Sequence, residues 1–174
     1  VCNEILVAQE TVPALVAAAT IGDQKYTSVA AAIAAAPAGA VISLMADVQG
    51  QGDAPAIAVS GQELTIDLNG RSVAGSGCDG VIQVAGGANV TIQGEGSVTA
   101  VECKNCDPAE GYAMAVWAKG ASTVTIKGGE FASTSWSGAQ QLDMIYAAAG
   151  STINIEGGSF ASASPAWTLN LQDN

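Results

Sequence analysis

Cysteine offers the most distinctive chemistry in this sequence of 174 residues, which contains no histidine. The four cysteines are Cys2, Cys78, Cys103 and Cys106. The Cys-X-X-Cys spacing at 103 and 106 suits a redox pair, but thioredoxin-type chemistry needs a helix directly after the motif, whereas Pro108 and Gly111 indicate a loop. A zinc site would need further ligands from Cys2 or from a second chain. We therefore expect no bound metal and no cofactor.

The lack of histidine and the acidity of the chain exclude several classes of function. Without histidine there is no Ser-His-Asp or Cys-His nucleophile system, and the commonest general base is missing. Five basic and sixteen acidic side chains give a net charge of −11, which repels nucleic-acid phosphates and gives no attraction to anionic membranes. The apolar run at residues 12–19 is shorter than the roughly 20 residues of a membrane helix. We expect neither a nucleic-acid partner nor a membrane span.

Internal repeats predict which elements position the remaining residues. Four segments share an apolar alternation, a glycine turn and a further apolar residue: LTIDLNGRSV, NVTIQGEGSV, TVTIKGGEF and TINIEGGSF. Their equivalent isoleucines, Ile66, Ile92, Ile126 and Ile155, are 26, 34 and 29 residues apart. Spacings of this size are typical of solenoids and propellers, in which one structural unit is used repeatedly.

Each repeat contains three short apolar strands joined by glycine corners. This pattern predicts an all-β fold, a parallel β-helix of about four to five rungs in which each strand pairs with its equivalent in the next rung. A propeller or an antiparallel sandwich is the alternative, and Asn69-Gly70 is the best hairpin turn available for it.

A short helix is expected ahead of the repeats, at about residues 27–36. Thr27 or Ser28 would be its N-cap, and Pro37 and Gly39 would end it. Packed across the first rung, this helix would cap the open N-terminal end of the solenoid.

The chain divides into two expected parts. Residues 1–20 would form an N-terminal arm or leader, and residues 21–174 the parallel β-helix domain. The apolar residues 5–19 have no place in the column, so the arm would pack on a neighbouring chain. The opposite end has no cap, which indicates that the chain is truncated at its C-terminus or that another chain covers that end.

The strings YTSVAAAIAAAPAGAVISLMADV, LTIDLNGRSV, VTIKGGEF and INIEGGSF together resemble the pectin-lyase-like family of right-handed parallel β-helix proteins. More narrowly, the sequence is similar to repeat proteins encoded by phages of gut bacteria and by the surface-protein genes of those bacteria. The resemblance covers roughly residues 20–174 and implies a right-handed coil. Because the Gly-Gly-X-Phe corner is a structural device, the resemblance is specific for the fold and not for an activity.

Enzymatic members of that family degrade acidic polysaccharides, and the catalytic residues that they need can be compared with the residues of this sequence. A calcium-dependent lyase needs clustered carboxylates and a basic residue, and a hydrolase needs several close aspartates. Arg71 is the only arginine. Later rungs place a mixed set of side chains at the outward position of Asp67, namely Gln93, Lys127 and Glu156. We expect no catalytic residue, and a polysaccharide lyase or hydrolase is the least favoured function.

An outward-facing row of side chains is the candidate surface for a ligand or partner. Gln83, Trp117 and Tyr146 each lie nine residues before a repeat isoleucine, out of phase with the inward-facing residues. Aromatic faces bind sugar C–H surfaces and also anchor protein interfaces. Tyr112 and Trp136, in the two largest inserts, would serve either role. The alternative is an aromatic ladder covered by an insert or by a neighbouring subunit.

The cysteines at 78 and 103 follow their repeat isoleucines by twelve and eleven residues, which puts them side by side on adjacent rungs. Neighbouring strands hold Cα atoms about 5 Å apart, within the range that a disulfide accepts. We expect Cys78 to pair with Cys103, or with Cys106 if the loop bends back. Free thiols, as in a cytosolic protein, are the alternative, since a disulfide would suit an extracellular protein.

Taken together, these features favour a non-enzymatic structural or decoration protein on a phage particle, which mediates assembly or surface attachment. Its partners would be other virion or surface protein chains in a homo-oligomer or larger assembly, and its location the virion surface or the cell exterior. The alternative function is a glycan-binding module of a bacterial cell-surface adhesin.

Overall fold

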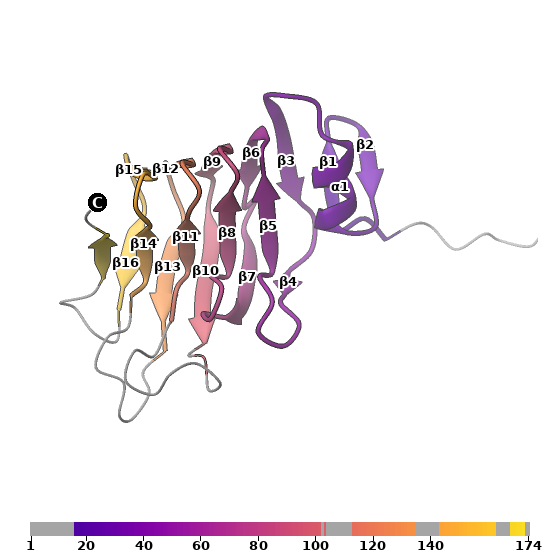
Figure 1. Cartoon of the computed structure of the whole chain (residues 1–174). Coiled ribbons are helices and arrows are strands. Elements are labelled where there is room, and N and C mark those ends of the chain that lie inside the picture. Colours follow the sequence, from indigo (N-terminus) through magenta and orange to yellow (C-terminus); the bar gives the residue numbers. More distant parts are fainter. Residues whose placement is uncertain (1–15, 102, 104–112, 135–142, 163–167, 173–174) are drawn as a thin grey trace, which may run out of the picture.

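The computed structural model describes residues 16–101, 103, 113–134, 143–162 and 168–172, and these residues form a column of stacked strands (Figure 1). The first sheet contains, in spatial order, β15 (Thr152–Ile155), β12 (Thr123–Ile126), β9 (Asn89–Gln93), β6 (Glu63–Asp67), β3 (Ala40–Leu44), β1 (Ala19–Ile21) and β2 (Gln24–Tyr26). The second contains β16 (Ser159–Ala161), β13 (Glu130–Ser133), β10 (Gly96–Val101), β7 (Arg71–Ser76) and β4 (Val48–Gln49). The third contains β17 (Leu169–Leu171), β14 (Ile145–Ala147), β11 (Val116–Ala118), β8 (Ile82–Ala85) and β5 (Ile57–Ser60).

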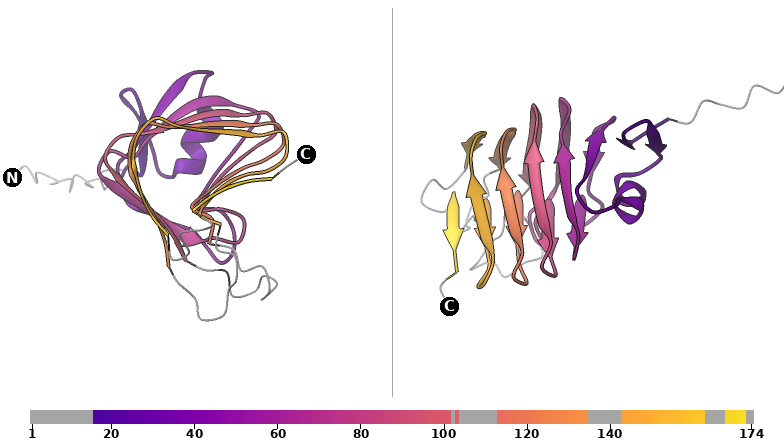
Figure 2. Two further views of the ribbon diagram at one scale, coloured as in Figure 1. Left: turned by 90° about the vertical axis from the view of Figure 1, so that its left-hand side faces the viewer. Right: turned by 90° about the horizontal axis from the view of Figure 1, so that it is seen from above.

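From β3 onward the chain visits the first, second and third sheets in turn and then repeats the circuit, which makes a β-solenoid of about four turns. Every pairing between successive turns is parallel, and the turns overlie one another when viewed down the column (Figure 2, left). The predicted parallel solenoid is therefore confirmed, and the sandwich with hairpin turns is not formed.

The core of the column consists of rows of apolar side chains in matching register. Ile66, Ile92, Ile126 and Ile155 pair from one turn to the next, as the repeat alignment predicts, and the first three are fully buried. Ile42 adds a fifth member by pairing with Ile66. The sequence alignment missed it because Met45-Ala46-Asp47 follows this strand where the other repeats have a glycine corner.

A second row carries bulkier side chains toward the C-terminal end of the column. Its members are Val73, Val98, Phe131 and Phe160. The two phenyl rings stack with their centroids 5.2 Å apart, a separation at which aromatic pairs contribute favourably to packing. In the third and fourth turns, two phenylalanine rings therefore occupy the space that valine side chains occupy in the earlier turns.

Glycine at the corner between the first and second sheets is required by backbone geometry. Gly96 has a φ of +138°, which L-residues with a side chain rarely adopt. A Cβ atom on Gly96 would also lie 2.5 Å from the carbonyl oxygen of Arg71 in the neighbouring turn. Only glycine lets the two turns approach closely enough for their strands to pair.

The N-terminal end contains the expected helix, α1 (Val29–Ala35), and an additional hairpin. Ser28 is the N-cap, and its Oγ accepts a hydrogen bond of 3.1 Å from the amide of Ala31. One face of α1 is buried in the core of the column, through Val29, Ala32 and Ile33.

The hairpin of β1 and β2 was not predicted, because its strands have three residues each and lie outside the repeats. It joins the first sheet through antiparallel pairing of β1 with β3. Ala19 in β1 is fully buried. The boundary expected between residues 20 and 21 therefore falls inside β1, and the column begins at least as early as Ala19.

Candidate functional site

The outward-facing row on the third sheet consists of residues in direct register. Gln83 pairs with Trp117, and Trp117 pairs with Tyr146. Ala58 extends this row in one direction and Asn170 in the other. All three of the sequence-predicted side chains are partly exposed, since period-two alternation turns them away from the core while their neighbours Val116 and Ala118 are fully buried.

The aromatic rings of this row contact other side chains of the same face. The Trp117 and Tyr146 rings stack at a centroid separation of 6.3 Å and an interplanar angle of 25°. The ammonium group of Lys119 lies 4.1 Å from the centroid of the Trp117 ring, within the range of a cation–π interaction. Because of these two contacts, less of the face of the Trp117 ring is open to a sugar than in an isolated indole.

Polar atoms along the row are also engaged. The Tyr146 hydroxyl donates a hydrogen bond of 2.9 Å to Oε1 of Gln172, and Nε2 of Gln83 donates one of 2.8 Å to the Asp79 carbonyl. The indole Nε1 of Trp117 is different, because it is buried and has no hydrogen-bond partner among the described residues. Among the described residues of this row, it is the buried donor that is left without an acceptor.

Asp143 is a buried acid beside the row that the sequence did not identify as important. It is 4% exposed, and its Oδ1 has no hydrogen-bond partner within the described part of the chain. Burial raises the pKa of this carboxyl, and a hydrogen bond with the Asn170 side chain opposes the rise. Its position in the repeat could have predicted its burial. Asp143 precedes Tyr146 by three residues, just as the buried Met114 precedes Trp117.

The cysteines at 78 and 103 are joined by a disulfide, with their Cα atoms 4.9 Å apart. This is the first of the two pairings that the repeat spacing favoured, and Cys2 and Cys106 lie outside the described residues. The Asp53 carboxylate lies close to both sulfur atoms. Because the sulfurs are bonded to each other, they are not thiolate ligands, so this group of three residues is better described as a cystine with an acidic neighbour.

The outward row on the first sheet contains paired side chains of mixed charge. Gln93 donates a hydrogen bond of 3.2 Å to Asp67, and Lys127 lies 3.8 Å from Glu156 in an exposed ion pair. This matches the mixed set of side chains expected in sequence, with each member engaged by its neighbour in the adjacent turn.

Asp47, which directly precedes β4 of the second sheet, has a lowered pKa. The amide of Ser72 donates a hydrogen bond of 2.9 Å to the Asp47 carboxylate. This bond is the main reason why the pKa of Asp47 is lowered, and Arg71 makes a smaller contribution.

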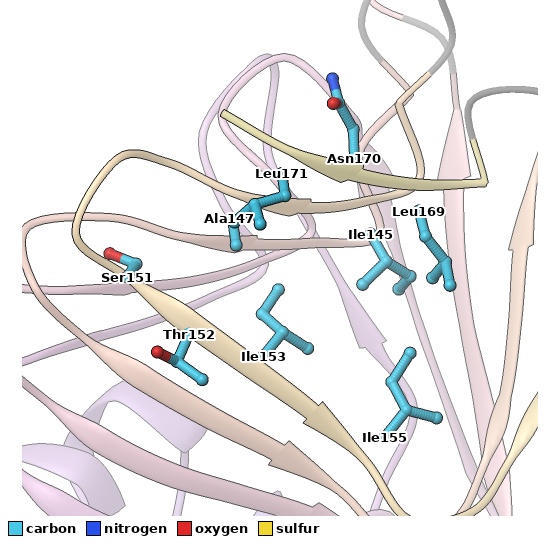
Figure 3. Close-up of a pocket in the computed structure, with 9 residues that line it drawn as sticks. All are labelled: Ile145, Ala147, Ser151, Thr152, Ile153, Ile155, Leu169, Asn170 and Leu171. Carbon is cyan, nitrogen blue, oxygen red and sulfur yellow. The ribbon is translucent and has the colours of Figure 1, made fainter. Parts of the chain in front are cut away.

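An apolar pocket of about 330 Å³ lies at the C-terminal end of the column (Figure 3). Its lining residues are Ile145, Ala147, Ser151, Thr152, Ile153, Ile155, Leu169, Asn170 and Leu171. Ile155 is 42% exposed, Leu169 58% and Leu171 65%. These side chains point from the last turn toward the space where a further turn would lie, so the pocket is the open end of the core.

Two of the predicted surface residues, Tyr112 and Trp136, lie outside the described residues. Across the described part of the chain, no helix has the length and apolar character needed to cross a membrane.

Comparisons with protein-family models, with curated proteins and with solved structures find no match to this chain. The function therefore has to be argued from its own surfaces.

Proposed function

We propose that this protein is a non-enzymatic structural component that holds neighbouring protein chains, as a decoration protein on the surface of a phage particle. The observation that carries the proposal is the distribution of contacts on the column. Several outward-facing polar side chains bind one another, as Gln93 binds Asp67, while large apolar side chains, among them Leu169 and Leu171, are exposed. Exposed apolar surface of this kind is typical of protein interfaces.

The proposal includes features of the coil and of its location. The solenoid is right-handed, as in the pectin-lyase-like proteins that the sequence resembles, and α1 caps its N-terminal end. The cystine of Cys78 and Cys103 suits the oxidising conditions outside the cell, which favours the virion surface or the cell exterior. The chain's partners are other virion or surface proteins, among them copies of itself.

The test is removal of the N-terminal arm. Because β1 begins at Ala19, deletion of residues 1–15 spares every described strand. We expect the shortened chain to keep the circular dichroism spectrum of the column and to lose incorporation into the assembly, measured by co-sedimentation with particles. Unchanged incorporation would contradict the proposed role of the arm.

A glycan-binding module of a bacterial adhesin is the second candidate function. The observation in its favour is the partly exposed row of Gln83, Trp117 and Tyr146. A glycan array separates the two candidates: binding that is lost in Trp117→Ala and retained in Trp117→Phe would favour the adhesin. Absence of binding by the native chain would favour the decoration protein. A polysaccharide lyase or hydrolase is tested by assaying for new reducing ends or unsaturated products from acidic polysaccharides.

A further inference from the structure

The corner that follows the second sheet brings together one metal-ligating side chain from each of three successive turns. Asp53 follows β4, Cys78 follows β7 and Cys103 follows β10, and these three strands are neighbours in the second sheet. A carboxylate oxygen of Asp53 and the two sulfur atoms all lie within 4.8 Å of one another. Cys103 is 1% exposed, whereas Asp53 is exposed, so the group is open to solvent on its carboxylate side.

Hydrogen bonds orient the carboxylate of this group. The Ser76 hydroxyl donates a hydrogen bond of 3.1 Å to Oδ1 of Asp53, and the same hydroxyl oxygen accepts one of 3.3 Å from the amide of Cys78. Carboxylates that bind metal ions are typically held by a second residue in this way. The cystine itself is neutral and gives the carboxylate no charge to pair with, whereas a cation held between the sulfur atoms and the carboxylate would.

The separations of the three ligand atoms suit zinc when the sulfur atoms are not bonded to each other. Zn²⁺ binds thiolate sulfur at about 2.3 Å and carboxylate oxygen at about 2.0–2.2 Å in tetrahedral geometry, which puts two ligand atoms of one ion roughly 3.5 to 3.8 Å apart. Ligand atoms that already lie within 4.8 Å of one another reach these separations by side-chain rotation. Thiolates select zinc over magnesium and calcium, which prefer oxygen ligands.

We propose that Cys78, Cys103 and Asp53 bind one Zn²⁺ ion when a thiol reductant has opened the disulfide. Reduction breaks the Sγ–Sγ bond: two thiol groups of the reductant supply two electrons and two protons to the cysteines and are themselves oxidised to a disulfide. Zinc then displaces both cysteine protons, because the thiolate is the form that binds the metal. A water molecule completes the four ligands.

The inference goes beyond the proposed function and does not depend on it. The disulfide in this structure is the oxidised form of the corner, to which the expectation of no bound metal applies. A newly made chain is in a reducing compartment, where thiols persist, and zinc would hold the three turns together there. Outside the cell, a disulfide oxidant takes up two electrons from the thiolates, the cystine forms again and the ion is released.

The experiment measures zinc binding by the full 174-residue chain with Cys2→Ser and Cys106→Ser, so that its only thiols are those of the site. The chain is reduced, freed of reductant without air and titrated with Zn²⁺ against a chromophoric chelator. We expect one ion per chain, with a Kd of about 1 µM or lower. The same chain in its oxidised form should bind zinc at least about 100-fold more weakly, because it has no thiolates.

Asp53→Asn tests the carboxylate, and Asp23→Asn is the matched control. Both substitutions remove one negative charge from an exposed side chain, but Asp23 lies between β1 and β2, away from the cysteines. Asp53→Asn should raise the Kd of the reduced chain about 100-fold or more, since even residues that only support a ligand contribute 10- to 100-fold. Asp23→Asn should leave the Kd unchanged. Circular dichroism checks that both variants are folded.

Co²⁺ replaces zinc as a spectroscopic probe of the sulfur ligands. We expect the reduced chain with Co²⁺ to show thiolate-to-cobalt charge-transfer absorption, and Cys78→Ser to lose most of it. A reduced chain that binds no zinc overturns the inference, as does equal zinc binding by the reduced and oxidised forms. Equal Kd values for Asp53→Asn and Asp23→Asn would also overturn it, because Asp53 would then not be a ligand.

Discussion

At the residue scale, buried and exposed carboxylates give the stability of the column opposite dependences on pH. Asp143 is buried and its pKa is raised above 3.8, so the folded chain keeps its proton at pH values where the unfolded chain has released it. The free energy of unfolding therefore falls as the pH rises from about 3.8 through the raised pKa. Asp47 acts in the other sense: its lowered pKa contributes stability above 3.8 that is lost as the pH falls through the lowered value.

Replacing Asp143 by asparagine should remove the first of these effects. The amide keeps the size of the side chain and carries no charge to desolvate. We expect Asp143→Asn to have a higher Tm than the native chain above the raised pKa, with the difference disappearing toward about pH 3. Thermal unfolding followed by circular dichroism over a series of pH values measures it. Asp47→Asn is the control, because it should lower the Tm at neutral pH; an equal response of both variants would contradict this account.

At the element scale, the corners decide whether successive turns can pair. Gly96 combines a positive φ with a close neighbouring backbone, so Gly96→Ala should cost on the order of 3 kcal/mol of unfolding free energy. Gly150 has a φ of +77°, but no described atom lies within 4 Å of the position that a Cβ would occupy, so Gly150→Ala should cost only about 1 kcal/mol. Urea unfolding measures the loss of unfolding free energy in both variants. Equal losses would show that the positive φ alone, and not the close neighbouring backbone, makes glycine necessary at Gly96.

The disulfide links adjacent turns at the corner after the second sheet. Its two cysteines are 25 residues apart, and closing a loop of that length in the unfolded chain stabilises the folded state by about 3 kcal/mol. We expect the double variant Cys78→Ser, Cys103→Ser to lose about this much in urea unfolding. The native chain in reductant should lose the same amount, and a midpoint that reductant does not move would contradict the expectation.

At the scale of the whole molecule, a solenoid is a linear stack in which each turn contacts only its neighbours. Stability should therefore decrease toward an uncovered end. In the native 174-residue chain, we expect amides of β17, β16 and β15 to exchange first and those of β6 and β9 last, as measured by hydrogen exchange with mass spectrometry. Uniform protection along the column would instead indicate a single cooperative unit.

The parts of the fold that the sequence predicted are those that recur. The isoleucine row from Ile66 to Ile155 and its parallel register follow from period-two alternation combined with a glycine corner. The strand of Ile42 lacks the glycine corner, and the β1–β2 hairpin lies outside the repeats, so the sequence pattern predicted neither of them. The helix was predicted at about residues 27–36 and is shorter, at Val29–Ala35, because Ser28 occupies the N-cap and Ala36 the C-cap.

By itself, the sequence determined the solenoid, the outward orientation of Gln83, Trp117 and Tyr146, and the proximity of Cys78 to Cys103. Each of these depends on periodicity along one chain, which local backbone geometry enforces. Only the tertiary structure decided what these side chains touch: that Trp117 stacks on Tyr146 beneath Lys119, that Asp143 is buried, and that the last turn leaves leucines exposed. Those properties depend on which turn lies next in space, and neighbours across turns are 24 or more residues apart along the chain.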